Sequence, residues 1–415
     1  RDSNIDRFGL PGTKRVSEAA VANETGSYHG WAKWAHHVSR HPVAYLVVGL
    51  VAVLTLAAPL LDLRLGQTDS SQSPTSSTLR RSYDLLSDSF GPGYNGPLVL
   101  AVDLRGVTTP PDQVVGQLKS AVSADPGVAS VPRAAIGPDG TAAVLQVIPK
   151  SAPQDRGTSQ LVDRLRSSVL PSVLASTGGA VYVGGQTATF IDLSNRVADR
   201  LPLFIGCVVG LSFILLMIVF RSILVPLKAA IMNLLSIGAA YGVIVAVFQW
   251  GWGASLFGVH QSLPIISFIP MFMFAILFGL SMDYEVFILS RIREEYNHSG
   301  DNTGSVIMGI TATARVITSA ALIMISVFIS FVFGGEPTIK MMGLGLATAV
   351  FVDATIIRMI LVPASMRLMG SANWWLPRFL DRIIPNLDIE GESRLPSAEF
   401  EFDHPVEPDR EPVPV

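Results

Sequence analysis

Two adjacent side chains inside an apolar run, Asp283 and Tyr284, are the best candidates for chemistry in this sequence. An ionisable residue in a membrane span is costly, so it is treated first as a functional candidate. Asp283 lies eight residues before Arg291, about 12 Å from the polar end of the run at ~1.5 Å per helical residue. Aspartate is too short to reach water over that distance. A carboxyl group balanced between burial and nearby donors can take up and release protons.

Helical geometry separates these two side chains. Neighbours on a helix point about 100° apart, so we expect Asp283 and Tyr284 each to bond across to another helix rather than to each other. Gly279 lies one turn before Asp283 and would let a facing helix approach closely. Glu285 is nearer the end of the run, where we expect it to form a structural pair at the inner interface.

Further polar residues lie in the next two apolar runs. Arg315 is at a depth similar to that of Asp283, Thr318 follows it, and Asp353 lies midway along the last run. Asp353 and Arg358 are five residues apart, which aligns them poorly for a direct pair on an α-helix. These residues either form a structural network that holds the helices together or take part in a proton relay. The structural network is the simpler interpretation.

Composition excludes several classes of protein. Of the 415 residues, 49% are hydrophobic and only 15% are charged, with a net charge of −3. Disordered proteins, coiled coils and nucleic-acid binders all need more charge. Cys207 is the only cysteine, the seven histidines have no metal-ligand or triad spacing, and no phosphate-binding Gly-x-x-x-x-Gly-Lys loop occurs. We therefore expect no enzyme, no metal and no cofactor.

Six apolar runs are long enough to cross a bilayer, which takes about 20 residues. They predict an α-helical membrane bundle of six transmembrane helices with a large polar domain after the first. The expected division of the chain is a linker with an interfacial helix at 1–42, a span at 43–61, a polar domain at 62–200, a five-span bundle at 201–369, an interfacial helix at 370–388 and a disordered tail at 389–415.

The short loops predict the orientation of these spans. Lys and Arg residues concentrate in the loops on one side, and the loops 251–262 and 334–337 carry none. Positive loops remain cytoplasmic. We therefore expect both termini in the cytoplasm and the domain at 62–200 outside the cell (plasma) membrane. That domain alternates strand-like and helix-like patterns in the order βαββαβ, a ferredoxin-like α+β arrangement.

Several of these segments resemble one family of membrane proteins. The run 278–296, with its Met-Asp-Tyr-Glu-Val-Phe core, is similar to the MmpL transporters of the RND (resistance-nodulation-division) superfamily. The runs 219–228, 315–319, 353–358 and 184–188 are similar too. The resemblance covers about residues 40–370.

The resemblance implies export driven by the proton gradient, with lipids or lipid-like amphiphiles as cargo. Such transporters have two homologous halves, and this chain resembles the second, with 62–200 as its external porter domain. Asp283 and Tyr284 would be this half's share of the proton relay, facing an equivalent pair in the other half. Gly279, Phe287, Arg315, Thr318 and Asp353 are candidates for the relay or for support of the bundle.

Two questions stay open at this point. The expected partner is the missing N-terminal half or a second copy of this chain, together with a lipid or amphiphile and the membrane, and no nucleic acid. The alternative function is a non-transporting membrane protein that uses the same bundle for binding, sensing or scaffolding. The sequence does not name the cargo.

Overall fold

The computed structural model describes residues 30–258 and 262–383. In this part of the chain, six helical segments are long and apolar enough to cross a membrane, which confirms the predicted six-helix bundle. The six spans and their helices are α2 (Pro42–Ala57) with η2 (Ala58–Asp62), α7 (Gln186–Phe220), α8 (Leu224–Ile244) with η6 (Val245–Gln249), α9 (Ile269–Ser299), α10 (Asn302–Val332), and α11 (Pro337–Val352) followed by η8 (Asp353–Leu361), α12 (Val362–Met369) and η9 (Gly370–Trp374).

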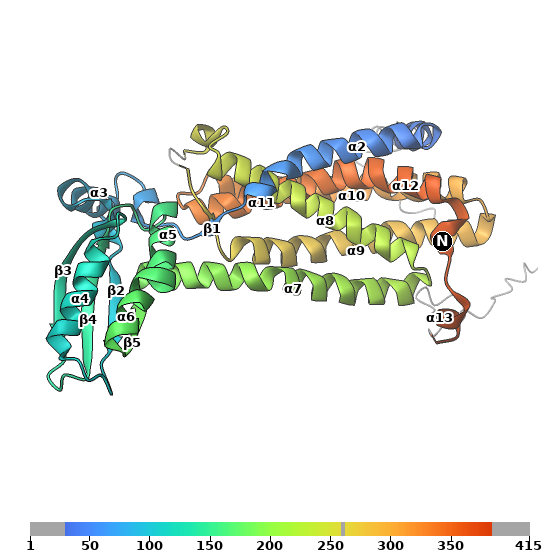
Figure 1. Ribbon diagram of the computed structural model, residues 1–415. Helices are drawn as coiled ribbons and strands as arrows, with labels where there is room; N and C mark the ends of the chain where they lie inside the picture. The colour runs from blue at the N-terminus through green and yellow to red at the C-terminus, as the bar shows by residue number, and fades with distance from the viewer. Residues whose placement is uncertain (1–29, 259–261, 384–415) are drawn as a thin grey trace, which may run out of the picture.

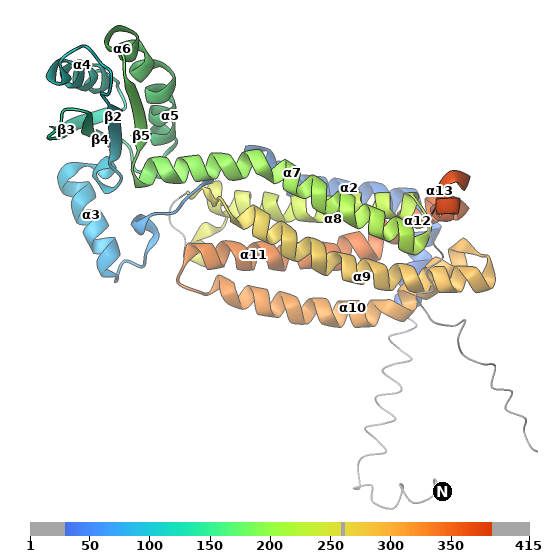
Figure 2. The same ribbon diagram turned by 90° about the horizontal axis from the view of Figure 1, so that it is seen from below.

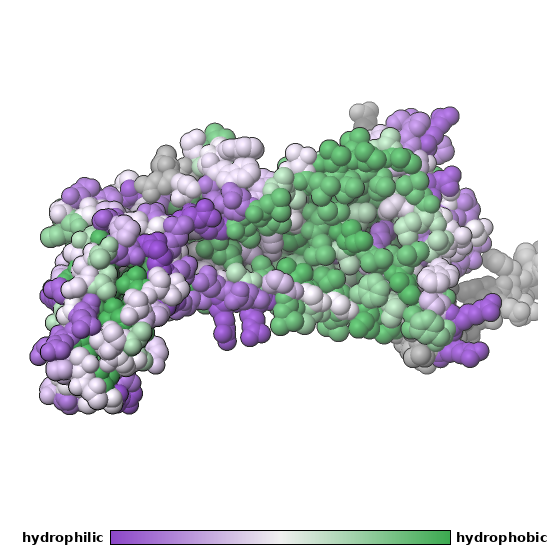
Figure 3. Space-filling model, viewed as in Figure 1, coloured by the Kyte–Doolittle hydropathy of each residue, from purple (hydrophilic) through white to green (hydrophobic). Residues whose placement is uncertain are grey.

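The spans lie side by side as one elongated bundle, with a separate α/β domain at one end (Figures 1 and 2). Helices α8, α9 and α11 have the larger buried shares, whereas α2, α7 and α10 are mostly exposed within this chain. Small residues allow close helix packing. A Cβ on Gly242 of α8 would collide with the carbonyl oxygen of Leu56 in α2. A continuous apolar band covers the bundle in Figure 3, with hydrophilic residues beyond both ends.

The α/β domain contains four strands and the helices between them. Along the chain these are β2 (Leu98–Asp103), α4 (Pro111–Ser123), β3 (Val128–Ile136), β4 (Ala142–Pro149), α5 (Arg156–Arg164), η5 (Leu165–Val169), α6 (Leu170–Thr177) and β5 (Ala180–Gly184). The sheet is antiparallel, in the order β3-β4-β2-β5. Alternate residues of β2, including Leu98 and Leu100, are buried against apolar residues of α4 and α5.

Two segments of the chain join this domain to the bundle. Helix α7 starts directly after β5 and runs without a break past residue 200 into the membrane span. Strand β1 (Leu65–Gly66) follows the first span and pairs in parallel with β6 (Ile265–Ile266) at the end of the bundle. Between β1 and the sheet lies α3 (Thr78–Phe90), a helix that the sequence patterns did not predict.

The ends of the described chain pack against the bundle. Residues 30–40 are helical, and the indole of Trp34 donates a hydrogen bond to the carbonyl of Met359. In the expected interfacial helix at 370–388, the structure has η9 and the short helix α13 (Arg378–Ile383). Residues 1–29 of the expected linker at 1–42, and the expected disordered tail at 389–415, lie outside the described residues.

Candidate functional site

Helix α9 carries two faces of opposite character. Ser281, Tyr284 and Glu285 point into the bundle, and we call them the packed face. Gly279, Asp283 and Phe287 recur every four residues on the other side, and all three are exposed. Residues four apart lie on the same side of a helix. We call these three residues the open face.

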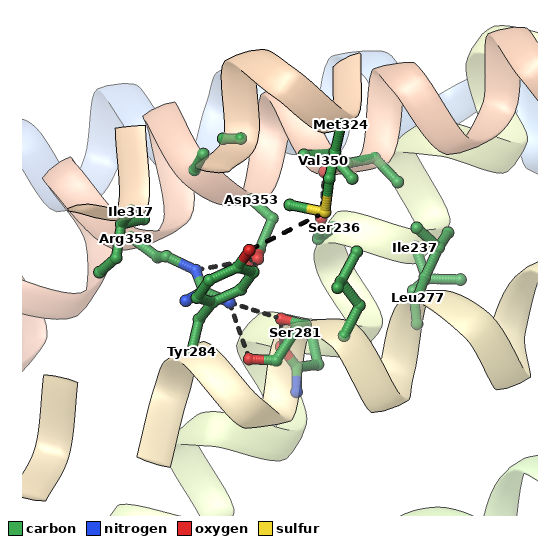
Figure 4. Close-up of a pocket in the computed structure, with 15 residues that line it drawn as sticks. Ser236, Ile237, Leu277, Ser281, Tyr284, Ile317, Met324, Val350, Asp353 and Arg358 are labelled. Carbon is green, nitrogen blue, oxygen red and sulfur yellow. Dashed lines mark hydrogen bonds and ion pairs between the residues drawn. The ribbon is translucent and has the colours of Figure 1, made fainter. Parts of the chain in front are cut away.

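Tyr284 lies beside a buried arginine. The guanidinium of Arg358 lies 4.8 Å from the centre of the Tyr284 ring, a cation–π contact. The Tyr284 hydroxyl lies 3.9 Å from the sulfur of Met324 on α10. Figure 4 shows the ring between these two partners. Tyr284 therefore contacts neighbouring helices and not Asp283, as the helical angle predicts.

Arg358 is held by Asp353 from its own span. Arg358 Nε and Nη2 donate to Asp353 Oδ2 at 2.9 and 2.6 Å, and both residues are buried. The expected poor alignment of this pair is wrong. Residues 353–361 form a π-helix, whose wider turn brings residues five apart onto one side. Arg358 Nη2 also donates to the carbonyl oxygen of Ser281 at 2.7 Å, which links this span to α9.

A small cavity adjoins this cluster. Its volume is about 20 Å³, enough for about one water molecule. Asn233, Ser281 and Tyr284 line it together with Asp353 and Arg358. The Ser281 hydroxyl donates to Asn233 Oδ1 at 2.5 Å. Among the described residues, Asp353 Oδ1 has no hydrogen-bond partner, so a water in the cavity would have an acceptor to bind.

Glu285 has a partner that the sequence patterns did not single out. Lys228 of α8 places its Nζ 3.9 Å from Glu285 Oε1, and both side chains are almost completely buried. Breaking a buried pair of this kind is strongly destabilising, because the remaining charge has no compensation. In the sequence, Lys228 is a lone lysine at the start of an apolar run and the last residue of the run 219–228.

The remaining predicted residues lie away from this cluster. Asp283 makes no hydrogen bond or ion pair with any residue that the structure describes. No described atom beyond its own helix comes within 4 Å of a Cβ built on Gly279. Arg315 is exposed on α10, and Thr318 is partly buried there. The structure thus brings together Tyr284 and Asp353, but it places Gly279, Asp283, Phe287 and Arg315 on exposed surfaces.

The described residues contain no group of three or more His, Cys, Asp or Glu side chains placed to bind a metal. The cluster can bind water through its carboxyl, hydroxyl and amide groups. Its charges are embedded in a bundle that crosses the membrane. This combination is typical of an ion or proton pathway.

Comparison with known proteins gives the family. The model of the MMPL family matches residues 103–384. Membrane protein YdfJ of Bacillus subtilis is 38% identical over 371 residues, covering 89% of this chain and 51% of YdfJ. The mycolic acid-containing lipids exporter MmpL11 of Mycolicibacterium smegmatis is 36% identical over 389 residues, covering 92% of this chain and 40% of that protein. The heme uptake protein MmpL11 of Mycobacterium tuberculosis is 37% identical, covering 87% and 37%.

The chain spans about half the length, or less, of the curated relatives it matches. The family model nevertheless covers well over half of the chain, including the α/β domain from the end of β2 onward and five of the six spans. This chain is therefore a multi-pass membrane protein that belongs to the MMPL family.

Proposed function

We propose that this chain is one half of a proton-driven exporter of lipids or lipid-like amphiphiles. The single observation that carries the proposal is the position of Asp283. This carboxyl lies in the middle of an apolar span, yet it is exposed on the open face and has no partner among the described residues. A bare carboxylate facing lipid would be costly, so a second unit covering the open face accounts for it best.

The second unit supplies the facing Asp–Tyr pair. It is either the other half of a longer polypeptide or a second copy of this chain. The length of the relatives supports the first form, since they are about twice as long as this chain or longer. Gly279 leaves room beside Asp283 for a facing helix to approach.

Asp283 and Tyr284 then act as the relay from two different faces of one helix. Protonation of Asp283 removes its charge and changes how α9 packs against the second unit. Tyr284 carries that movement to Arg358 and Asp353 on the last span. One charge that crosses 100 mV releases about 2.3 kcal/mol, so a few protons per cycle suffice to extract a lipid.

The α/β domain serves as the external porter domain, in a ferredoxin-like βαββαβ arrangement, with both termini of the chain in the cytoplasm. Helix α7 supports the coupling, because it is continuous from β5 of this domain into the second span. Movement of the bundle therefore reaches the domain through one continuous helix. Two relatives are named for what they transport, one as an exporter of mycolic acid-containing lipids and the other as a heme uptake protein.

The test is export of a fluorescent glycolipid from proteoliposomes that hold the assembled transporter and a pH gradient. Asp283→Asn should lower export about a hundredfold or more, as expected when a proton-transferring side chain is removed. Glu295→Gln, on the same helix nearer its C-terminus, is the matched control and should export normally. Retained export in Asp283→Asn would contradict the relay. Lipid binding that ignores collapse of the gradient, without export, would favour a sensing or scaffold function.

A further inference from the structure

A group of arginines lies at the end of the bundle opposite the α/β domain, where α7 and α9 end and α13 begins (Figures 1 and 2). Arg221 follows the last residue of α7, and Arg293 is close to the end of α9. Arg378 and Arg382 are exposed on α13. We call Arg221, Arg293 and the nearby Trp374 the corner site, because they surround the corner between α7 and α8.

One buried hydrogen bond holds this corner against the segment that follows the last span. The hydroxyl of Ser222, a fully buried residue, donates to the carbonyl oxygen of Asn373 at 2.5 Å. Arg221 precedes Ser222 and Trp374 follows Asn373, so the bond places Arg221 and Trp374 in neighbouring positions. The guanidinium of Arg221 donates to Asp381 Oδ1 at 2.5 Å. The first arginine of the corner site is therefore fixed in place and paired with a carboxylate.

The second arginine, Arg293, is held by an aromatic ring instead. Its guanidinium lies 4.7 Å from the centre of the Trp374 ring, a cation–π contact, and that ring stacks on Tyr296 with the centroids 5.5 Å apart. Arg293 makes no hydrogen bond or ion pair with any residue that the structure describes, and its Nη1 is buried. The side chain is partly exposed, so a group from outside the chain can reach its other nitrogens.

The charges around Arg293 leave its guanidinium without compensation. Glu294, the next residue, pairs with Arg291 at 2.6 Å. Arg221, a second cation, is close enough to repel Arg293. A partly buried cation beside another cation is costly unless an anion joins them. A phosphate group fits best, because its oxygens match the planar set of guanidinium donors.

The depth of the corner site indicates where that phosphate comes from. Helix α9 is one of the six spans, and Arg293 lies near its end. At this end of the bundle the apolar surface gives way to hydrophilic residues (Figure 3). The head groups of a bilayer lie directly beyond its hydrocarbon core, so lipid phosphates are at this level. Basic pockets between transmembrane helices at such a level bind anionic head groups.

We propose that Arg293 and Arg221 bind the phosphate of an anionic phospholipid of the surrounding membrane. Trp374 orients the Arg293 guanidinium, and Asp381 limits the affinity because it already pairs with Arg221. This lipid is a component of the bilayer and not the cargo. The inference is therefore independent of the proposed export, and neither arginine belongs to the proposed relay.

The experiment uses the full chain in lipid nanodiscs and native mass spectrometry. The probes are phosphatidylglycerol, phosphatidylcholine with the same acyl chains, and free glycerol phosphate. Phosphatidylglycerol should bind at least about fivefold more tightly than phosphatidylcholine, whose ammonium group would lie beside the arginines. Glycerol phosphate should compete weakly, because it is not concentrated in the membrane. Equal binding of the two lipids would overturn the site, and full competition by glycerol phosphate would overturn the lipid assignment.

A matched pair of variants distinguishes a site from a diffuse surface attraction. Arg293→Gln removes the uncompensated charge and should weaken phosphatidylglycerol binding about fivefold. Arg291→Gln is the control on the same helix, and it should change binding less than about twofold because Glu294 already pairs with Arg291. Equal losses in the two variants would show a diffuse attraction and contradict the proposed site.

A third variant should gain affinity, which damage to the fold does not explain. Asp381→Asn removes the carboxylate that pairs with Arg221 and should tighten phosphatidylglycerol binding about two- to fivefold. Thermal unfolding of each variant confirms that the bundle is intact. Unchanged binding in both Arg293→Gln and Asp381→Asn, with unfolding like that of the parent, would overturn the proposal.

Discussion

The two faces of α9 carry carboxyl groups only two residues apart, yet their surroundings differ completely. On the packed face, Glu285 is buried against Lys228, and Tyr284 lies under Arg358. On the open face, Asp283 is exposed and has no partner among the described residues. The charges of the packed face are paired with one another within the described part of this chain. Those of the open face require something outside it, which is why we assign proton exchange to Asp283 and support of the bundle to Glu285.

Removal of Arg358 should cause the largest loss of stability on the packed face. Arg358→Met leaves Asp353 buried without its cation, and losing one partner of a buried pair costs about 3–5 kcal/mol in the free energy of unfolding. The double variant Asp353→Leu with Arg358→Met removes both charges and should recover most of that loss. Thermal unfolding in detergent measures both. An Arg358→Met variant as stable as the parent would show that the pair does not hold the bundle.

Substitution of two glycines, one on the open face and one at a tight contact between helices, distinguishes the two environments. Gly242→Leu should destabilise the bundle by about 1–3 kcal/mol, because its side chain meets the backbone of α2. Gly279→Leu has open space and should change the unfolding free energy by less than about 0.5 kcal/mol. Export should nevertheless fall about tenfold in Gly279→Leu if a second unit packs there. Normal export in this variant would argue against a closely packed partner at the open face.

The ion pair between Asp125 and Arg164 in the α/β domain is partly exposed to solvent and contrasts with the buried pairs of the bundle. Asp125 accepts from Arg164 at 2.8 and 3.1 Å, and this guanidinium, followed by the backbone amide of Gly127, holds the pKa of the Asp125 carboxyl below its ordinary value. A lowered pKa in the folded state stabilises the fold above the ordinary pKa of about 4, and that stability is lost as the pH falls through the folded value.

Asp125→Asn should therefore cost about 1–2 kcal/mol at pH 7, with a small contribution from the pair itself because the Arg164 side chain is 42% exposed. The difference from the parent should shrink as the pH falls below 4. Hydrogen exchange of β3, which starts next to Asp125, measures the change. An effect that stays constant from pH 7 to pH 3 would contradict the ionic origin.

The parts of the fold that do not depend on long-range contacts could be predicted from the sequence. Six apolar runs identify six spans because length and hydropathy alone set that property. Helix α3 and the β1–β6 pair were missed. Strand β1 has only two residues and is defined by a partner 200 residues away, so no local periodicity reports it.

The candidate site could be predicted in part. The cost of charge in a membrane identifies Asp283, and the angle between helical neighbours separates it from Tyr284. The sequence does not reveal the π-helix that aligns Asp353 with Arg358, because tertiary packing selects that turn. The sequence also does not show that Lys228 pairs with Glu285. The two residues lie on different helices, and no local pattern around either one indicates its partner.

Carbodiimide labelling tests the central claim most directly. Dicyclohexylcarbodiimide is an apolar reagent that modifies protonated carboxyl groups it can reach within a membrane, and mass spectrometry of peptides from α9 and the last span reads out the modified residue. The account predicts labelling of Asp283, with Glu285 and Asp353 unlabelled because both are buried and paired with cations. Labelling of Glu285 with Asp283 unmodified would contradict the assignment of the two faces.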